Sequence, residues 1–543
     1  MSATHNVERQ EIEQIYGKIS PFEFKNRLIN LAKGEDEKIA RALLDAGRGN
    51  PNWIAAAPRE AFFTFGHFAV EETRRTWSEN SLAGMPKKEG IAKRLSTYLQ
   101  SHLNAPGEEL IKKTIDYGVE VLNFLPDDLV YELADGIIGD NYPVPDRMLV
   151  HIEKIVHEYL VQEMCYNKPP VGRFNLFAVE GATAAMCYIF DSLIANELLS
   201  RGDKIALMVP IFTPYLEIPH LPRYNFQVIH IRATEIAEDG THTWQYPKSE
   251  LEKLQDSSIK ALFVVNPSNP PSVAIKPESV KELIKIIDKS NPDLMIISDD
   301  VYGTFVSEFR SLMADLPFNT IGVYSFSKYF GVTGWRLGTI ALHENNVFDK
   351  RLKNLPENLK EELRQRYEGV STTPDEIPFI DRIVADSRQV ALNHTAGLST
   401  PQQVQMAFFC VFALLDKEND YKKLTIDICH RRQRLLFEGL GLELRKDIYD
   451  AAYYTEFDLL EWACHYYGSE FADYLQKNHK PVDILYRLAE ESSIVLLSGA
   501  GFHGPEWSIR ISLANLEDEC YLKIGKTLHK ILDELVDNWK KLM

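Results

Sequence analysis

Short apolar runs alternate with stretches of mixed apolar and polar residues through the middle of the chain. The runs end in Gly, Pro, Asn or Asp, which is the pattern of buried parallel strands joined by helices. Strands are predicted over residues 174–179, 204–209, 226–231, 261–265, 294–297, 320–325 and 337–342. Helices are predicted over residues 182–197, 277–287 and 402–415. This alternation predicts an α/β domain with a mostly parallel sheet, in which ligands bind at the strand ends.

The predicted large α/β domain spans residues 145–395 and is flanked by two further segments. Residues 1–144 mix helical stretches with a turn-rich segment at 47–53, and residues 396–543 contain several helices and a short strand around 507–513. We expect both segments to form one smaller α+β domain. A helical insertion in the first segment is charged around residues 80–125, and its chemistry is not indicated by the sequence.

Composition excludes several classes of function without choosing one. The 543 residues are 45% hydrophobic and carry a formal net charge of -18, which disfavours a general binder of nucleic acid or anionic membrane. The longest apolar run, 406–415, is too short to cross a bilayer. The polar, acidic start lacks the features of a signal peptide, and the six cysteines show no metal-binding spacing. We therefore expect a cytoplasmic protein with reduced thiols and no bound metal.

The segment Ser325-Phe326-Ser327-Lys328-Tyr329-Phe330-Gly331 places one lysine among small and hydroxyl residues, and Arg336 follows eight positions later. A lysine amine can hold the aldehyde of pyridoxal phosphate as a Schiff base, while Ser325 and Arg336 can bind the phosphate. A lone Ser-x-x-Lys also arises by chance around a solvated surface lysine. The motif therefore needs support from its neighbours.

Three segments can complete a cofactor site on the phosphate and ring sides. Gly181, Ala182 and Thr183 follow a predicted strand and open a helix, where backbone amides and a hydroxyl can bind phosphate. Phe212, in Pro210-Ile211-Phe212-Thr213-Pro214-Tyr215, can stack on a ring, although most such phenylalanines belong to a core. Asn269 lies between prolines that hold a turn rigid, and the alternative is a Pro-rich surface loop.

Acidic and phenolic groups follow the strand predicted at 294–297. In Ser298-Asp299-Asp300-Val301-Tyr302, a carboxylate can keep a pyridine nitrogen protonated, and Tyr302 can donate to the ring hydroxyl. Paired aspartates can also bind Mg²⁺, but no third acidic ligand or nucleotide-type phosphate loop accompanies them.

Along the chain the motifs follow the order phosphate turn, stacking aromatic, Asn-Pro loop, Asp-x-x-Tyr, Ser-x-x-Lys and then Arg. In this order they resemble the motifs of the aspartate aminotransferase superfamily of pyridoxal phosphate enzymes. The resemblance implies phosphate binding by Gly181, Ala182, Thr183, Ser325 and Arg336, ring contacts by Phe212, Asn269, Asp299 and Tyr302, and catalysis by Lys328. It also implies that Arg510 binds the substrate α-carboxylate with its two-pronged guanidinium. Pro271-Ser272 replaces the common Thr-Gly, a departure expected to affect loop shape more than chemistry.

Within the superfamily the chain looks most like the bifunctional aspartate 4-decarboxylases. The features are its length, the insertion between Trp53 and about Pro143, the segment Asp45–Trp53, and Asn141-Tyr142-Pro143. This resemblance implies conversion of L-aspartate to L-alanine and CO₂, with aspartate aminotransferase activity that uses 2-oxo acids. It implies a homo-oligomer of at least two subunits, and the resembling enzymes include dodecamers.

Loss of the distal carboxylate demands loose contacts around it, because tight binding would stabilise the charge that must disappear. Arg48 is the first candidate for this contact and Lys25 the second. Tyr142, from a neighbouring subunit, is expected near the phosphate or substrate. Each has an ordinary structural alternative: Arg48 as a brace for the Gly-Asn-Pro turn, Lys25 as an exposed helix lysine, and Tyr142 as a packing residue.

Two other functions remain open from the sequence. A plain acidic-amino-acid aminotransferase would need a 2-oxo acid acceptor and release no CO₂. A ligand-sensing regulator would normally add a basic helix-turn-helix segment, and the N-terminal region has no basic cluster.

Overall fold

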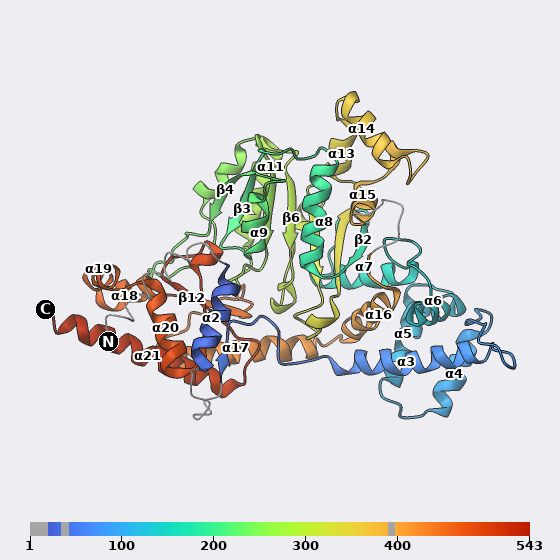
Figure 1. Ribbon diagram of the computed structural model, residues 1–543, viewed down its shortest axis with the longest axis horizontal. Coiled ribbons are helices and arrows are strands. Elements are labelled where there is room, and N and C mark those ends of the chain that lie inside the picture. The colour runs from blue at the N-terminus through green and yellow to red at the C-terminus, as the bar shows by residue number, and fades with distance from the viewer. Residues whose placement is uncertain (1–19, 34–42, 389–396, 543) are drawn as a thin grey trace. The chain divides into compact units, whose positions relative to one another are not determined.

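The computed structural model describes residues 20–33, 43–388 and 397–542, and Figure 1 labels their helices and strands. Contacts between residues divide the chain into two compact units. Unit 1 comprises Met1–Asn52, Lys204–Asn291 and Thr425–Met543, and unit 2 comprises Trp53–Asp203 and Pro292–Leu424. The predicted domain boundaries at 144 and 395 stay predictions, and residue 395 lies outside the described residues.

Four strands of unit 2 lie in the order β2, β8, β7, β6. Their bounds are Phe174–Val179 for β2, Met295–Asp299 for β6, Thr320–Ser325 for β7 and Gly338–His343 for β8. β6 and β7 are parallel, whereas β8 is antiparallel to both β7 and β2. Gly338 is paired with Val179 on one side and with Ser325 on the other, so the end of β2 and the end of β7 lie at the same edge.

Helices cover these strands and form a bundle beside them. The helices of unit 2 are α3 (Ala56–Arg74), α4 (Ile91–Ser101), α5 (Glu108–Asp116), α6 (Pro126–Ile138), α7 (Val150–Met164), α8 (Ala182–Ala195), α12 (Leu312–Asp315), α13 (Val347–Lys353), α14 (Glu357–Tyr367), α15 (Phe379–Asp386) and α16 (Thr400–Leu415). The apolar helix α16 packs against α3, α5, α6 and α7, which are grouped around it in Figure 1. Burial on several sides explains why its sequence is apolar without a polar face.

Unit 1 contains three parallel strands in the order β5, β3, β4: Ile259–Val265, Lys204–Val209 and Gln227–Arg232. A separate antiparallel sheet has the order β11 (Leu497–Ser498), β12 (Ser508–Ser512), β9 (Tyr454–Asp458). β1 (Leu44–Asp45) pairs in parallel with β10 (Ile494–Val495). The helices of unit 1 are α2 (Pro21–Lys33), α9 (Pro214–Glu217), α10 (Lys248–Leu251), α11 (Pro277–Ser290), α18 (Leu459–Tyr467), α19 (Ser469–Asn478), α20 (Pro481–Ser492) and α21 (Asp518–Lys540). α17 (Asp420–Leu440) begins in unit 2 and continues in unit 1.

The predicted α/β fold with a mostly parallel sheet is confirmed. Every predicted strand forms, with its ends within two residues of the expected positions. The predicted helices form as α8, α11 and α16, and a strand forms at Ser508–Ser512. The antiparallel β8 is the exception to the parallel arrangement within its set of strands. None of the described helices is both long and apolar enough to cross a membrane.

Candidate functional site

The lysine motif lies in unit 2, in the turn directly after β7. Every residue from Thr320 to Phe330 is buried except Lys328, which is half-buried. Phe326 stacks on both Phe330 and Tyr159, and the Phe330 ring lies tilted against Tyr159 in the same aromatic cluster. The cluster holds the residues before and after Lys328, so a rigid segment presents this one amine.

Three side chains fix the far end of the turn through its carbonyl groups. The indole of Trp53 donates to Tyr329 O at 3.1 Å, and the hydroxyl of Tyr421 donates to the same oxygen at 2.8 Å. The Arg59 guanidinium donates to Gly331 O at 2.6 Å. Gly331 has φ +61°, and a Cβ there would lie 1.9 Å from Trp53 O. Sequence reasoning gave no role to Arg59 or Tyr421, because a side chain that binds a distant backbone carbonyl leaves no local motif.

The predicted phosphate ligands Gly181, Ser325 and Arg336 are brought together in unit 2. Arg336 Nη2 donates to Glu180 O at 3.1 Å, and a Cβ on Gly181 would lie 2.5 Å from that nitrogen. A Cβ on Gly338 would lie 2.6 Å from Gly181 Cα, and Gly338 is paired with Ser325. The two glycines therefore allow the guanidinium and the end of β7 to approach the start of α8 closely.

The other two predicted phosphate residues form the first turn of α8. Gly181 precedes this helix with φ +83°, and Ala182 and Thr183 follow it, half-buried and exposed respectively. Backbone amides at a helix start are available to an anion, and the helix dipole favours negative charge there. This end of unit 2 has the donors that a phosphate requires.

Asp299 and Tyr302 are both buried at the end of β6. The neighbouring Asp300 has a different environment, because its carboxylate accepts hydrogen bonds from Ser298 Oγ at 2.7 Å and Ser311 Oγ at 2.5 Å. Burial raises the pKa of the Asp300 carboxyl well above its usual value. The serine hydroxyls thus fix Asp300 beneath the strand end that carries Asp299. Among the described residues, no three His, Cys, Asp or Glu side chains are grouped to bind a metal ion.

Phe212 and Asn269 are placed in unit 1. Phe212 makes an edge contact with Phe22, which in turn contacts Phe502. Asn269 is buried, and within the described ranges its Oδ1 has no hydrogen-bond partner. A buried, unsatisfied amide oxygen is costly unless a ligand or water completes it, so Asn269 fits a ligand contact better than a structural role.

The loop that follows Asn269 is tied to β9 by the residue that departs from the common Thr-Gly pattern. Ser272 takes φ +67°, a conformation that favours glycine. Its hydroxyl oxygen accepts from Tyr453 N at 3.1 Å and Tyr454 N at 3.3 Å. The serine side chain therefore fixes this loop through two backbone bonds that glycine could not make.

Arg510 lies on β12 of unit 1 and is only 1% exposed. Its Cζ is 3.8 Å from the centroid of the Tyr454 ring and 5.2 Å from that of Phe502. Among the described residues, its Nε and Nη1 have no hydrogen-bond acceptor. A buried guanidinium with donors in reserve is suited to a carboxylate that arrives from outside the chain.

Lys25 and Arg48 converge on one carboxylate of unit 1. Lys25 Nζ lies 3.8 Å and Arg48 Nε 3.3 Å from Asp45 Oδ2. Neither contact is an aligned hydrogen bond, whereas Asp45 Oδ1 accepts from Gly47 N at 3.0 Å. The Lys25 side chain is largely buried, and that of Arg48 is 61% exposed. Lys25 is therefore not the exposed helix lysine of the structural alternative.

The backbone carrying these cations is bonded to the strand of Arg510. Ser512 N, two residues after Arg510, donates to Ala46 O at 2.8 Å. A Cβ on Gly47 would meet Leu497 Cγ at 3.3 Å, and Leu497 is the pairing partner of Arg510. Unit 1 thus brings the loop of Arg48 beside β12. Tyr142 belongs to unit 2, where its side chain is 74% exposed rather than packed in a core.

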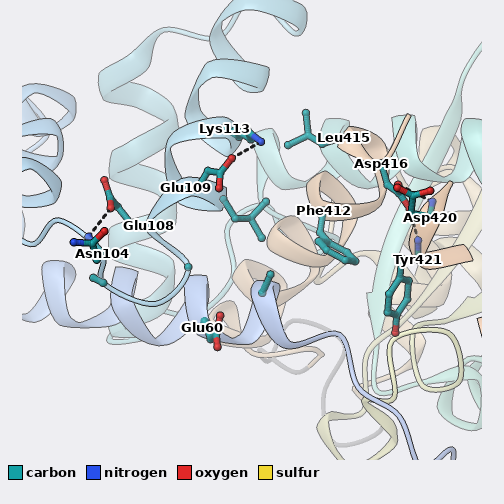
Figure 2. A pocket seen from close by; sticks show the side chains of 14 residues that line it. Glu60, Asn104, Glu108, Glu109, Lys113, Phe412, Leu415, Asp416, Asp420 and Tyr421 are labelled. Atoms are coloured by element: carbon teal, nitrogen blue, oxygen red, sulfur yellow. Dashed lines mark hydrogen bonds and ion pairs between the residues drawn. The ribbon is translucent and has the colours of Figure 1, made fainter. Parts of the chain in front are cut away.

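A cavity of about 660 Å³ in unit 2 contains none of the predicted site residues. Figure 2 shows its carboxylates on the surrounding helices and, at Asp416, directly after α16. Glu109 is paired with Lys113 at 2.7 Å. Loop residues 104–107 and α5 line one side, so part of the charged insertion forms this wall. The carboxylates give this cavity a negative lining, whereas the predicted phosphate site has the positive Arg336 guanidinium.

Comparisons with known proteins identify the family of the chain. Residues 181–524 match the family described as "Aminotransferase class I and II". The chain belongs to the class I and II aminotransferases. A bifunctional aspartate aminotransferase and L-aspartate beta-decarboxylase of a Pseudomonas species is 46% identical over 96% of this chain and 98% of its own length.

Two solved aminotransferases share the fold at much lower identity. The aspartate aminotransferase of Thermus thermophilus with maleate has a TM-score of 0.55 at 16% identity, over 94% of this chain and 96% of its own. The aromatic aminotransferase of Pyrococcus horikoshii OT3 also has a TM-score of 0.55 at 16% identity, over 91% and 96%.

Class I and II aminotransferases use pyridoxal phosphate, and the residues of this aminotransferase fit that group. Because Gly181 has no Cβ, the Arg336 guanidinium can lie against the start of α8, and the buried Oδ1 of Asn269 has no hydrogen-bond partner among the described residues. The family match includes every predicted cofactor residue and Arg510. It excludes Lys25, Arg48 and Tyr142, which belong to the part of the chain covered by the long Pseudomonas relative.

Proposed function

We propose that this aminotransferase converts L-aspartate to L-alanine and CO₂ and also transaminates aspartate. The observation that carries the proposal is the likeness to the bifunctional Pseudomonas enzyme, which extends over nearly the whole of both chains. It includes the N-terminal segment with Lys25, Arg48 and Tyr142, which the general family match omits.

Binding of the cofactor and substrate is assigned to separate groups of residues. Gly181, Ala182, Thr183, Ser325 and Arg336 bind the phosphate. Phe212, Asn269 and Tyr302 contact the ring, and Asp299 keeps a proton on the ring nitrogen. Arg510 binds the α-carboxylate, because a buried planar guanidinium can donate two parallel hydrogen bonds to it. The bound cofactor supplies an electron sink for bonds broken on the substrate.

Lys328 is the proposed acid–base group. Its amine takes the proton from the substrate α-carbon and returns a proton during turnover. The fixed turn around Lys328 limits the positions that this amine can reach, which favours proton transfer over a short path.

Arg48 and Lys25 are the proposed contacts of the distal carboxylate, with Asp45 as their shared counter-ion. The Asp45 carboxylate partly neutralises Lys25 and Arg48. The two cations therefore attract a substrate carboxylate more weakly than they would without Asp45. Weak attraction suits this group, because its charge disappears when CO₂ leaves.

The alternative function is a plain acidic-amino-acid aminotransferase. The two are separated by incubating the protein with L-aspartate and pyridoxal phosphate and measuring alanine, CO₂ and oxaloacetate. Equal amounts of alanine and CO₂ without an added 2-oxo acid support the decarboxylase, and oxaloacetate as the sole product supports the alternative. Conversion of singly negative aspartate to neutral alanine and CO₂ takes up one proton, and dissolved CO₂ returns a proton when it hydrates to bicarbonate. An unchanged pH in a weak buffer that is continuously purged of CO₂ would therefore also count against decarboxylation.

The proposed state is a cytoplasmic homo-oligomer of at least two subunits, with Tyr142 acting at a neighbouring subunit's site. Its exposure in the single chain supports an intermolecular role. Mixing the inactive variants Tyr142→Ala and Lys328→Ala under subunit-exchange conditions should restore some activity. No restoration despite demonstrated exchange would place Tyr142 in its own subunit's site or outside it.

A further inference from the structure

We propose that Glu456 is a positioning residue that tunes how tightly Arg510 holds a substrate carboxylate, by changing its own charge beside the guanidinium. The inference rests on the proposed function, which makes Arg510 the α-carboxylate ligand. Glu456 lies on β9, directly opposite Arg510 on β12. Directly paired residues of antiparallel strands have their side chains on the same face, with Cβ atoms about 5 Å apart.

Glu456 is held next to Arg510 without being bonded to it. Ser508 Oγ donates to Glu456 Oε1 at 2.6 Å. A Cβ on Gly499 or Gly504 would lie 2.3 or 2.2 Å from that oxygen, so the glycines make room for it. Within the described part of the chain, Glu456 Oε2 and Arg510 Nε and Nη1 have no hydrogen-bond partner. The carboxyl is therefore close enough to act on the guanidinium by charge while leaving its donors to a ligand.

The Glu456 carboxyl can change charge in the range where an enzyme works. Burial raises its pKa to about 7, although the Ser508 hydrogen bond and the Arg510 charge lower it. The other charged groups facing it are Asp458 on the same strand and His242 from the 239–244 loop. His242 is 3.0 Å from Asp458 Oδ2, and its pKa is raised because this bond and nearby carboxylates outweigh burial.

Charge on Glu456 competes with the substrate for Arg510. When Glu456 is ionised, its charge partly neutralises the buried guanidinium, and an arriving carboxylate meets a second negative charge. When Glu456 is protonated, this charge is lost, and Arg510 keeps its contacts with the Tyr454 and Phe502 rings. Carboxylate affinity should therefore rise as pH falls through the pKa of Glu456. By linkage, carboxylate binding should draw a proton onto Glu456.

The test compares the pyridoxal phosphate-loaded wild type with Glu456→Gln, which is neutral at every pH and retains an amide oxygen for Ser508. Binding of succinate, an unreactive dicarboxylate, is measured by calorimetry at about pH 6 and pH 8.5. The two proteins should bind alike at low pH, and the variant should bind roughly tenfold more tightly at high pH. Calorimetry near pH 7.5 in buffers of different ionisation enthalpy gives the number of protons taken up when succinate binds. This number should be larger for the wild type than for Glu456→Gln.

Asp450→Asn is the matched control, because burial also raises the pKa of Asp450 to about 7 although it is bonded to Gln433 and not paired with Arg510. It should keep the pH dependence and proton uptake of the wild type. Ser508→Ala is the second variant: it releases Glu456 to bond Arg510 and should weaken succinate binding at high pH. The same pH dependence and proton uptake in the wild type and Glu456→Gln would overturn the inference.

Arg510→Gln separates this inference from the proposed function. Loss of succinate binding in Arg510→Gln with no effect of Glu456→Gln rejects only the role of Glu456. Retained binding in Arg510→Gln rejects the carboxylate assignment on which the inference rests.

Discussion

Replacing Asp45 with asparagine should change the balance between the two proposed reactions. The substitution removes the charge shared by Lys25 and Arg48 while keeping Oδ1 as an acceptor for Gly47 N. Both cations are then freer to hold the distal carboxylate of aspartate. The Michaelis constant for aspartate should fall. Decarboxylation should slow, because the added attraction stabilises a charge that is lost in that step.

The magnitude follows from the distances of the two ion pairs. Unit charges 4 Å apart attract by about 1 kcal/mol in water and about 4 kcal/mol near a protein surface. Arg48, at 3.3 Å, is 61% exposed, so its pair belongs at the lower value. Lys25 is more buried but farther away, at 3.8 Å, and its bond is not aligned. We expect about 1 kcal/mol of added attraction for the substrate, which is roughly fivefold in equilibrium.

The assay is the ratio of oxaloacetate to alanine formed from aspartate in the presence of 2-oxoglutarate, whose amination gives glutamate and no alanine. Removal of the α-proton leaves the distal carboxylate charged, so the ratio should rise roughly fivefold in Asp45→Asn. Asp447→Asn is the control, since it breaks an ion pair of 2.8 Å with Lys276 elsewhere in unit 1. A raised Michaelis constant, or a lowered one with an unchanged ratio, would refute the reasoning.

Three further outcomes are expected. Lys328→Ala should lose the cofactor link that borohydride traps, and a protein still labelled after reduction would contradict the assignment. Gly338→Ala should weaken pyridoxal phosphate binding by more than about tenfold, because the new Cβ would lie 2.6 Å from Gly181 Cα. In the control Gly334→Ala the Cβ would point into open space, so this variant should bind the cofactor normally. Equilibrium dialysis with absorbance measures cofactor binding in both variants. Asp450→Asn should lose less thermal stability than the wild type between about pH 4 and pH 7. Burial raises the pKa of the wild-type Asp450 carboxyl to about 7, so the stability that its protonated form contributes is lost as the pH rises over that range. An equally steep fall in the melting temperature of the variant would oppose this account.

The sequence predicted the strands well because burial on both faces leaves continuous apolar runs that polar turn residues interrupt. The direction of each strand relative to its neighbours was harder to predict. β8 is antiparallel to β7, and residues 326–337 between them form the lysine turn and one 3-10 segment instead of a crossover helix. The strand was found at Gly338–His343, but its apolar pattern alone carried no information about direction.

Candidate site residues were predictable where the chemistry is local. Lys328 and Arg336 belong to one short segment, and Asp299 directly ends a strand. Arg59 and Glu456 were not predicted, since each acts on a residue that is distant in sequence. Arg59 reaches Gly331 O across 272 positions. Glu456 reaches Arg510 only through the pairing of β9 with β12. Long-range pairing of this kind requires the three-dimensional structure.

Arg510, Arg48 and Lys25, the candidates for the two substrate carboxylates, belong to unit 1, whereas the phosphate candidates and Lys328 belong to unit 2. The loop of Arg48 and the strand of Arg510 are joined by the bond from Ser512 N to Ala46 O. A change in the N-terminal segment can therefore alter how the distal carboxylate is held while the β7 turn and the start of α8 keep their structure. On this basis, the choice between transamination and decarboxylation should respond to Asp45, Arg48 and Lys25 more than to substitutions around the phosphate.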